Sequence, residues 1–424
     1  MAKKMKSSGV DWIGDIPEKW DVCKIINCLS SIGSGTTPQG QEYYENEYIP
    51  WLNTGDLNDG YIEKTEKSVS EKALSDYSVL KRFDAGSVVV AMYGATVGKL
   101  GIVTSSLVTN QACCVMTSNE KLYNKFLFYL FMAGKTYLIS LSLGSGQPNI
   151  NQNTVKTFDI PFVPLSEQKA IADYLDDRCG KIDDFIAKQK AVIEKLKEYK
   201  QSVITEAVTK GLNPATPMKS SGVDWIGDIP EKWDVRKLFQ VFTQVKNKNQ
   251  GMTETNLLSL SYGKIKQKNI ETSFGLLPES FETYNIIEKN DIVLRLTDLQ
   301  NDQKSVRVGL STQRGIITSA YVTMRAKDSR MAPYLYYLLH TFDIEKGFYG
   351  MGDGVRQGLN WDELKKLLSL VLPPLSEQKE IADYLDAKCA EIDAFIAKKQ
   401  TVIDKLTEYK KSLIYEYVTG KQEA

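Results

Sequence analysis

Two stretches of this chain are nearly identical: MKSSGVDWIGDIPEKWDVCK at residues 5–24 and MKSSGVDWIGDIPEKWDVRK at residues 218–237. They differ only where Cys23 is replaced by Arg236. The chain is therefore built from two tandem halves, and each stretch is the head of one half. Trp12, Ile16, Pro17 and Trp20 recur in the second head, and aromatic residues in such a pattern usually bury. We interpret the heads as packing elements.

Each half ends in a repeated tail, PLSEQKAIADYLDDRCGKIDDFIAKQKAVIEKLKEYK from Pro164 and PLSEQKEIADYLDAKCAEIDAFIAKKQTVIDKLTEYK from Pro374. Ser166 and Ser376 are expected helix N-caps, since a glutamate follows each in the first turn. Apolar residues then follow a seven-residue repeat over about 40 residues, which as a helix is about 60 Å long. They are Ile182, Phe185, Ile186, Val192, Ile193, Leu196, Tyr199 and Val203 in the first tail, and Ile392, Phe395, Ile396, Val402, Ile403, Leu406, Tyr409 and Leu413 in the second.

A long helix with one apolar stripe needs a partner of equal length, and its own copy is the one available. We predict that the tails form a coiled coil through Ile182, Ile186, Ile193, Leu196, Ile392, Ile396, Ile403 and Leu406. The alternative is that each tail packs separately on its own insert. Because the second head directly follows the first tail, a closed cyclic arrangement would place the C-terminal tail beside the first head. This arrangement gives approximate two-fold symmetry.

The inserts between head and tail share almost no run of identical residues, yet both predict mixed α and β structure. In the first insert, strands are expected at 48–52, 87–92 and 112–116, followed by a helix from about residue 121. In the second, strands are expected at 257–262, 291–296 and 316–324, then a helix from about residue 333. Polar glycine-containing loops follow at 144–151 and 352–360, and their Asn, Gln and Arg side chains are of the types that read base edges in DNA. Loops of this composition also occur in proteins that bind no nucleic acid.

The predicted organisation is thus α+β: two mixed α/β domains in tandem, related by a pseudo-two-fold axis. Its parts are domain 1 at 1–163, helix 1 at 164–211, a linker at 212–217, domain 2 at 218–373 and helix 2 at 374–420.

Composition limits the class of protein. Apolar residues make up 42% of the chain and charged residues 25%, which is typical of globular proteins. The 53 basic and 53 acidic side chains cancel, which argues against nonspecific coating of DNA. The insert at 25–163 has 10 basic and 12 acidic residues, and the insert at 238–372 has 17 and 14. Any binding to nucleic acid must therefore depend on local geometry or on partner subunits.

No export or membrane segment is predicted, and we expect a cytoplasmic protein. The N-terminus has basic residues but no apolar stretch behind them. The apolar segment at 126–143 contains Lys135 near its middle, so we predict a buried amphipathic helix. Six cysteines without a C-x-x-C pair, and one histidine, predict neither a zinc site nor a disulfide framework.

A search for catalytic motifs finds only partial matches. The GATVGK stretch at 94–99 is one residue too short for a phosphate-binding loop, and Leu100 stands where Ser or Thr would hold magnesium. We interpret it as a turn between strands. The single histidine, His340, lies in the apolar run YLYYLLHTF and is expected to be a core or helix-surface residue. No dinucleotide fingerprint and no adenine-methyltransferase motif is present, so the chain does not read as an enzyme.

At this level of detail the chain resembles the specificity subunits of type I restriction-modification enzymes. The resemblance is carried by the repeated P-L-S-E-Q-K-x-I-A-D-Y-L-D and D-W-I-G-D-I-P-E-K-W, and by G-S-G-T-T-P at 33–38, I-P-W-L-N-T-G-D-L at 49–57 and T-N-Q-A-C-C at 109–114. It covers essentially the whole chain. It implies two target-recognition domains held apart by two antiparallel helices, with each domain reading one half of a split double-stranded DNA sequence and the helices setting the gap.

The resemblance also implies partners and cofactors. The subunit would have no catalytic activity and no cofactor of its own. Two modification subunits that use S-adenosylmethionine would dock on the helices, and restriction subunits would add an ATP- and Mg-dependent nuclease. Two other readings stay open: a coiled-coil adaptor that organises protein partners without reading DNA, and a nuclease or methyltransferase in its own right.

The candidate DNA-contacting residues are polar loop residues of the two inserts. For the first half-site they are Thr36, Thr37, Asn53, Thr54, Asp56, Tyr93, Lys99, Asn110, Gln111, Gln147, Asn149 and Asn151. For the second they are Lys246, Lys248, Asn249, Arg295, Asp298, Arg307, Ser319, Tyr321, Arg356 and Gln357.

Overall fold

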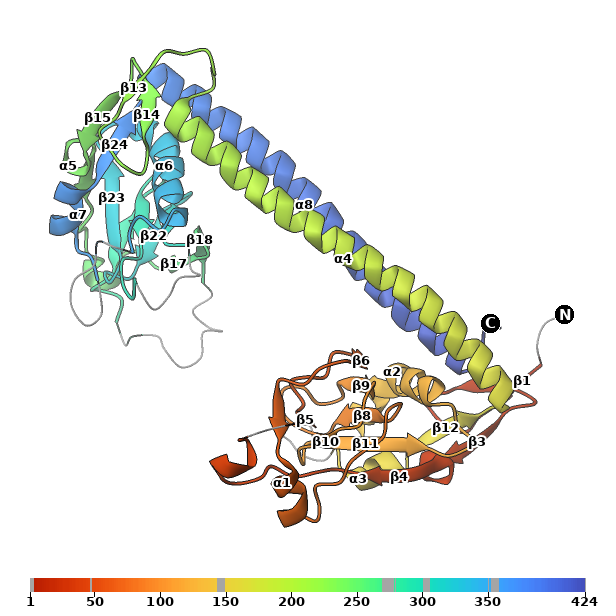
Figure 1. Cartoon of the computed structure of the whole chain (residues 1–424). Coiled ribbons are helices and arrows are strands. Elements are labelled where there is room, and N and C mark those ends of the chain that lie inside the picture. The colour runs from red at the N-terminus through yellow and green to blue at the C-terminus, as the bar shows by residue number, and fades with distance from the viewer. Residues whose placement is uncertain are drawn as a thin grey trace. The chain divides into compact units, whose positions relative to one another are not determined.

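A computed structural model describes residues 4–45, 48–142, 149–268, 278, 280–299, 306–349, 351 and 358–423. The chain divides into two compact units, residues 1–190 with 400–424, and residues 191–399. Each unit holds one head, one insert and a part of both long helices (Figure 1). The candidates Gln147, Arg356 and Gln357, with most of both glycine loops, lie outside the described residues.

The two tails form the long helices α4 (Leu165–Lys210) and α8 (Leu375–Val418), as predicted. The expected N-cap position was wrong by two residues for α4, because the amide of Gln168 already donates to the carbonyl of Pro164. Ser166 therefore lies within the first turn. The segment that leads into α4 is held instead by the buried Gln168, whose Nε2 donates to the carbonyl of Val163 over 2.7 Å.

Within each unit the two helices pack antiparallel. In unit 1, Lys410 Nζ lies 2.6 Å from Asp183 Oδ2, and in unit 2, Lys200 Nζ lies 2.8 Å from Asp393 Oδ2. These two ion pairs are repeat equivalents. The eight residues predicted to form the helix–helix contact are all buried or half-buried, which confirms the coiled coil.

Six other apolar residues of the seven-residue pattern, which were not among the predicted contact residues, are exposed. Phe185, Val192 and Tyr199 of α4 are 47%, 38% and 50% exposed. Their repeat equivalents on α8, Phe395, Val402 and Tyr409, are 48%, 38% and 57% exposed. Two helices cover only one side of each other, so one row of the seven-residue pattern stays in contact with solvent.

The heads are packing elements, as predicted. In unit 1 the strands are β1 (Met5–Ser7), β2 (Asp15–Pro17) and β3 (Asp21–Lys24), and in unit 2 they are β13 (Met218–Ser220), β14 (Asp228–Pro230) and β15 (Asp234–Lys237). β1 pairs with β2 and β13 with β14 in the same register. Trp20 and Trp233 are both at most 1% exposed.

The C-terminal tail lies beside the first head, as the cyclic arrangement required. Tyr415 Oη and Lys421 Nζ both donate to the carbonyl of Ile13, over 3.2 and 2.8 Å. Gly420 has a positive φ of 73°, and a Cβ there would lie 2.5 Å from Pro17. Gly211, with a φ of 78°, meets Trp233 in the same way in unit 2.

The first insert contains two sheets and one long helix. Its elements are β4 (Leu29–Gly33), β5 (Ile49–Leu52), β6 (Gly60–Ile62), β7 (Lys67–Val69), α1 (Glu71–Asp76), β8 (Val88–Ala91), β9 (Leu100–Val103), β10 (Val108–Thr109), β11 (Cys113–Ser118), α2 (Asn124–Ser140), α3 (Gln152–Lys156) and β12 (Asp159–Phe162). The sheet orders are β4-β11-β8-β9-β6 and β10-β5-β7, and β12 pairs with β3 of the head. The predicted strands and helix are confirmed.

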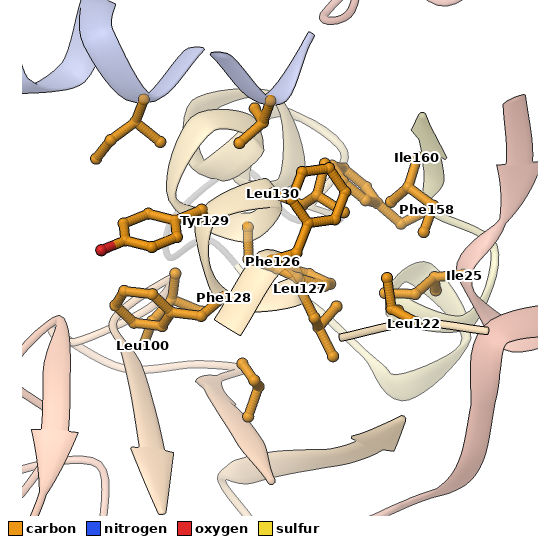
Figure 2. Close-up of a cluster of buried hydrophobic side chains, with 14 of the residues drawn as sticks. Ile25, Leu100, Leu122, Phe126, Leu127, Phe128, Tyr129, Leu130, Phe158 and Ile160 are labelled. Carbon is orange, nitrogen blue, oxygen red and sulfur yellow. The ribbon is translucent and has the colours of Figure 1, made fainter. Parts of the chain in front are cut away.

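The core of unit 1 forms around α2. Four side chains of α2 are fully buried: Phe126, Leu127, Leu130 and Phe131. Figure 2 shows α2 side chains in one cluster with Leu100 of the sheet and with Phe158. Lys135 is neutralised by Asp59 at 3.0 Å. In the described part of the chain, no helix is both long and apolar enough to cross a membrane.

The second insert has the same order of strands and C-terminal helices, but a short helix, α5, precedes its first strand and no helix corresponds to α1. Its elements are α5 (Leu238–Val241), β16 (Phe242–Gln244), β17 (Leu258–Ser261), β18 (Lys264–Gln267), β19 (Asn285–Ile287), β20 (Ile292–Leu294), β21 (Val308–Leu310), β22 (Gly315–Ile317), β23 (Val322–Ala326), α6 (Ala332–Ile344), α7 (Trp361–Leu367) and β24 (Ser369–Leu372). The main sheet runs β16-β23-β20-β21.

One predicted strand of this insert, 316–324, is in fact two strands, β22 and β23. A turn separates them, because the amide of Ala320 donates to Thr318 Oγ1 over 3.3 Å and the amide of Tyr321 donates to the carbonyl of Thr318. A threonine hydroxyl that hydrogen-bonds the nearby backbone competes with strand pairing.

Candidate nucleic-acid interfaces

In unit 1, three separate motifs meet at one edge of the recognition domain. The amide of Gly35 donates to Thr109 Oγ1 over 3.1 Å, and Trp51 Nε1 donates to the carbonyl of Thr36 over 3.2 Å. A Cβ at Gly35 would lie 1.7 Å from the carbonyl oxygen of Thr109, so only glycine fits. The stretches 33–38, 49–57 and 109–114 thus form a single junction, which we call the motif junction.

Asn53, Asp56 and Asn110 hold the motif junction together. Asn110 Nδ2 donates to Asn53 Oδ1 over 3.0 Å. Asp56 accepts the amide of Asn53 over 2.8 Å and the amide of Glu66 over 3.0 Å. All three side chains are half-buried, so they first of all shape the loops.

The other candidates around the junction differ in how exposed they are. Gln111 is exposed, and its Oε1 accepts a hydrogen bond from Thr37 Oγ1 over 2.8 Å. Thr36, Thr54 and Lys99 are half-buried near the same edge.

The glycine loop of unit 1 ends against the motif junction. Asn149 pairs with Tyr93 in an isolated bridge, and Gln152 Nε2 donates to Ser34 Oγ over 2.8 Å. Asn151 is the N-cap of α3, with its Oδ1 accepting the amide of Thr154 over 2.8 Å. The GATVGK stretch is the turn between β8 and β9, as interpreted.

In unit 2, two candidates are withdrawn because their side chains are buried. Asn249 is 0% exposed and holds the backbone of Glu254 from both sides, at 2.9 Å each. Arg307 is also 0% exposed. Its guanidinium donates to the carbonyls of Arg295, Thr297 and Asp298 over 3.1, 2.7 and 3.1 Å. Neither side chain can reach a base from this position.

Arg307 nevertheless shapes the surface, because its guanidinium fixes the loop that carries the candidates Arg295 and Asp298. The backbone amide of Arg307 donates to Asp343 Oδ2 over 2.6 Å. Burial raises the pKa of Asp343 to about 6. A carboxyl in the otherwise apolar helix α6 was the sequence signal that could have indicated this buried polar site.

The remaining candidates of unit 2 are accessible. Lys246, Asp298 and Ser319 are exposed, while Arg295 and Tyr321 are half-buried. Lys248 is exposed, and its Nζ donates to the carbonyl of Thr283 over 2.8 Å. The sequence-based selection omitted Lys264, Lys266 and Lys268, whose alternation along β18 is a signal that could have found them.

Two arginines of unit 2 are held in ion pairs. Arg325 binds the buried Asp291 through both carboxylate oxygens, over 2.6 and 2.7 Å. Arg314 bridges Glu254 and Glu288 over 2.9 and 2.7 Å. These two cations are therefore already neutralised within the domain.

Nothing in the described part of the chain gathers three or more His, Cys, Asp or Glu side chains that could hold a metal ion. His340 lies on α6, half-buried against Tyr336, and burial lowers its pKa to about 4. Burial raises the pKa of Cys113 and of Cys114 to about 12. Neutral imidazole and protonated thiols are the resting forms of these groups at pH 7.

The chain thus has two divergent α/β domains, each carried by the same repeated head and long helix. The chain matches the family "Type I restriction modification DNA specificity domain" twice, over residues 17–195 and 230–405. It belongs to this family and is a type I restriction-modification specificity subunit with two DNA target-recognition domains.

Relatives match along the whole chain. The MjaVIII specificity subunit of Methanocaldococcus jannaschii is 27% identical, over 96% of this chain and 93% of its own length. The StySPI specificity subunit of Salmonella potsdam is 22% identical, over 96% and 90%. A structure described as the basis of complex assembly and conformational transition of the type I R-M system has a TM-score of 0.69 at 17% identity, covering 96% of this chain and 99% of that chain. The HsdS subunit of Thermoanaerobacter tengcongensis has a TM-score of 0.50 at 16% identity, covering 96% and 98%. The structural likeness shows the fold.

Proposed function

We propose that this chain reads a bipartite, asymmetric DNA target, one half-site per recognition domain, and catalyses no reaction itself. The observation that carries the proposal is the contrast between a frame repeated almost residue for residue and two inserts that share an order of strands but few residues. Selection for one partner-binding frame with two different readouts produces this contrast. The cofactors S-adenosylmethionine, ATP and Mg are proposed to bind to the partner subunits and not to this chain.

In domain 1 the proposed reading surface is the exposed side of the motif junction. Thr36, Thr37, Thr54, Tyr93, Lys99, Gln111 and Asn149 are the side chains proposed to contact DNA there. An amide such as that of Gln111 pairs with adenine through two hydrogen bonds in the major groove. Asn53, Asp56, Asn110 and Asn151 are proposed to position this surface, because their hydrogen bonds are made within the domain.

In domain 2 the proposed reading surface comprises Lys246, Lys248, Arg295, Asp298, Ser319 and Tyr321. Arg307 is proposed as the residue that positions the loop at 295–298. Gln147, Arg356 and Gln357 remain predictions from sequence.

The exposed apolar row on the long helices is the proposed dock for two modification subunits. In unit 1, Phe185 and Tyr409 line a groove of about 260 Å³ between the helices. In unit 2, Tyr199 and Tyr384 belong to a hollow of about 820 Å³ that is lined mainly by the end of α4, residues 211–214 and the second head. Large exposed apolar side chains in a regular row mark a surface that another chain covers. The repeat places a row in each unit, which supports two docked modification subunits; restriction subunits would join them.

The proposed role of the helices in DNA reading is to set the gap between half-sites. Equal seven-residue insertions in α4 and α8 preserve the apolar repeat and lengthen each helix by about 10 Å. We expect a wider unspecified gap with both half-sites unchanged.

The decisive experiment maps methylated adenines genome-wide in a strain that carries this chain and its modification subunit, and in a strain that lacks only this chain. A split motif that disappears with the chain supports the proposal. An unchanged methylation pattern, with the modification subunit shown to be present and active, would favour the protein adaptor instead.

A further inference from the structure

We propose that the β17–β18 hairpin of domain 2 is a phosphate-binding clamp, with Tyr262 at its tip packed against the nucleic acid. The inference rests on the proposed DNA-reading function and assigns to this hairpin affinity for any DNA sequence rather than specificity. It falls outside the residues selected from sequence.

The hairpin has one apolar and one cationic side. Leu258 is buried and Leu260 and Ile265 are half-buried, and they face the domain. Gly309 of β21 makes room for them, since a Cβ there would lie 2.5 Å from Leu260 and 2.9 Å from Ile265. The hairpin is therefore anchored on the sheet by its inner side.

The outer side alternates with the inner one, as in any strand. Lys264 and Lys266 lie there and are exposed, with Lys268 following beyond the strand. Their cross-strand partners are Ser261 and Ser259, which carry no charge.

Among the described residues, none of the three ammonium groups has a carboxylate within ion-pair distance, in contrast to Arg314 and Arg325 of the same domain. Alternate residues of a strand are about 7 Å apart. Like charges at this spacing repel one another, and a polyanion that lies along the strand relieves that repulsion.

The turn at the tip is strained. Tyr262 and Gly263 both have positive φ, 47° and 74°, as a two-residue type I′ turn requires. Asn or Asp is the usual first residue of this turn, and a bulky side chain in this region of φ is disfavoured.

Tyr262 is also 81% exposed, so its ring gains little from packing within the domain. An aromatic residue that is both strained and exposed is unfavourable for the free protein. Beside a cationic track on a DNA duplex, such a ring can instead pack against the sugars of the backbone, a contact that does not depend on base sequence.

The hairpin lies at the end of domain 2 away from the head strands β13 and β14 (Figure 1). The head therefore supplies a matched control. Lys219, Lys232 and Lys237 are exposed, and within the described part of the chain none is in an ion pair.

The experiment measures DNA affinity of the full chain in complex with its modification subunits, on a target duplex and a nontarget duplex, over a salt series. For Lys264→Ala/Lys266→Ala/Lys268→Ala we expect the slope of log K against log salt to fall in magnitude by about 2 to 3. Affinity should fall by the same factor on both duplexes, so that the target preference is unchanged. The triple variant of Lys219, Lys232 and Lys237 should keep the wild-type slope. A wild-type slope in the hairpin variant overturns the clamp.

Tyr262→Asn separates binding from folding. Asparagine suits the turn, so we expect the Tm to rise by about 1 to 3 °C. DNA affinity should fall by the same factor on the target and the nontarget duplex, because the contact is to the backbone. Wild-type affinity in a stable Tyr262→Asn variant would remove Tyr262 from the interface.

These outcomes can be told apart from a failure of the proposed function. If the wild-type complex shows no preference for any target, the reading function fails regardless of the hairpin. If the preference is present and the hairpin variant keeps its salt slope, only the clamp is wrong.

Discussion

The two copies of the frame are stabilised by the same contacts, whereas the two inserts are stabilised by different ones. In the frame, Trp20 donates to Glu167 over 3.1 Å, and Trp233 donates to Glu377 over 3.1 Å. The inserts keep a common order of strands but stabilise their loops with different groups. Domain 1 uses the amide pair of Asn53 and Asn110, whereas domain 2 uses the buried guanidinium of Arg307.

This difference teaches which part of each half is free to change. The frame contacts join the head to the long helix in each half. A change of one residue in such a contact therefore leaves the residue that it contacted without its partner. Loops need only satisfy their own backbone groups, and several side-chain types can do that. A domain can thus acquire a new DNA-facing surface without altering its scaffold.

The largest test of this contrast is at the motif junction. Gly35→Val places a side chain where the carbonyl of Thr109 lies, so we expect a loss of about 3 kcal/mol or more in the stability of unit 1. Methylation directed by the first half-site should be lost. Gly55→Ala is the control, because a Cβ there meets nothing within 4 Å. Wild-type stability in the valine variant would show that the three motifs do not depend on their close approach.

A second test addresses the polar site that only domain 2 contains. Burial raises the pKa of Asp343 in the folded protein to about 6, above the ordinary value of 3.8 for an aspartate, so its stabilising contribution is present at low pH and is lost as the pH rises from about 4 through 6. We expect Asp343→Asn to remove about 2 kcal/mol of this pH dependence.

The measurement is the free energy of unfolding in urea of the variant and of the wild type at pH values from 4 to 7. Hydrogen exchange of the α6 amides measures the same difference locally. His340 has the opposite sign, since its pKa is lowered, and it is common to both proteins. A constant difference between variant and wild type across this range would contradict the assignment.

The smallest expected effect tests the equality of the two frame copies. Trp20→Phe and Trp233→Phe each remove the hydrogen bond from the indole to a glutamate, with an expected loss of about 1.5 kcal/mol. We expect equal losses, within about 0.5 kcal/mol, when each unit is followed by hydrogen exchange. Strongly unequal losses would show that identical sequence in the heads does not give identical energetics.

Much of the architecture was predictable because it depends on repetition and periodicity. The seven-residue pattern gave the long helices and their contact, whereas apolar runs with flanking turns indicated only three strands in each insert, fewer than half of those in the structure. The prediction of a single strand at 316–324 was wrong. Apolar residues lie on both sides of the turn, and the sequence does not show that the Thr318 hydroxyl forms a hydrogen bond within it.

The candidate site was less predictable than the fold. Polar residue type does not distinguish a side chain that faces solvent from one that satisfies backbone groups inside the domain. Arg307 and Asn249 were chosen for their chemistry, yet both bind carbonyls or amides of their own loops. The sequence-based selection missed Lys264, Lys266 and Lys268. They have no ion-pair partner in the described part of the chain, and this depends on the strand pairing, which places uncharged serines opposite Lys264 and Lys266.

The sequence by itself determined that this protein is two halves on one frame, because identity between distant stretches requires no knowledge of contacts. Its heptads also determined that the frame is helical. Only the tertiary structure decided which apolar residues remain exposed on the helices and which polar side chains are buried in the recognition domains. It also decided which lysines face outward with no ion-pair partner among the described residues. The physical reason is that burial and ion pairing depend on neighbours that are close in space and distant in the chain.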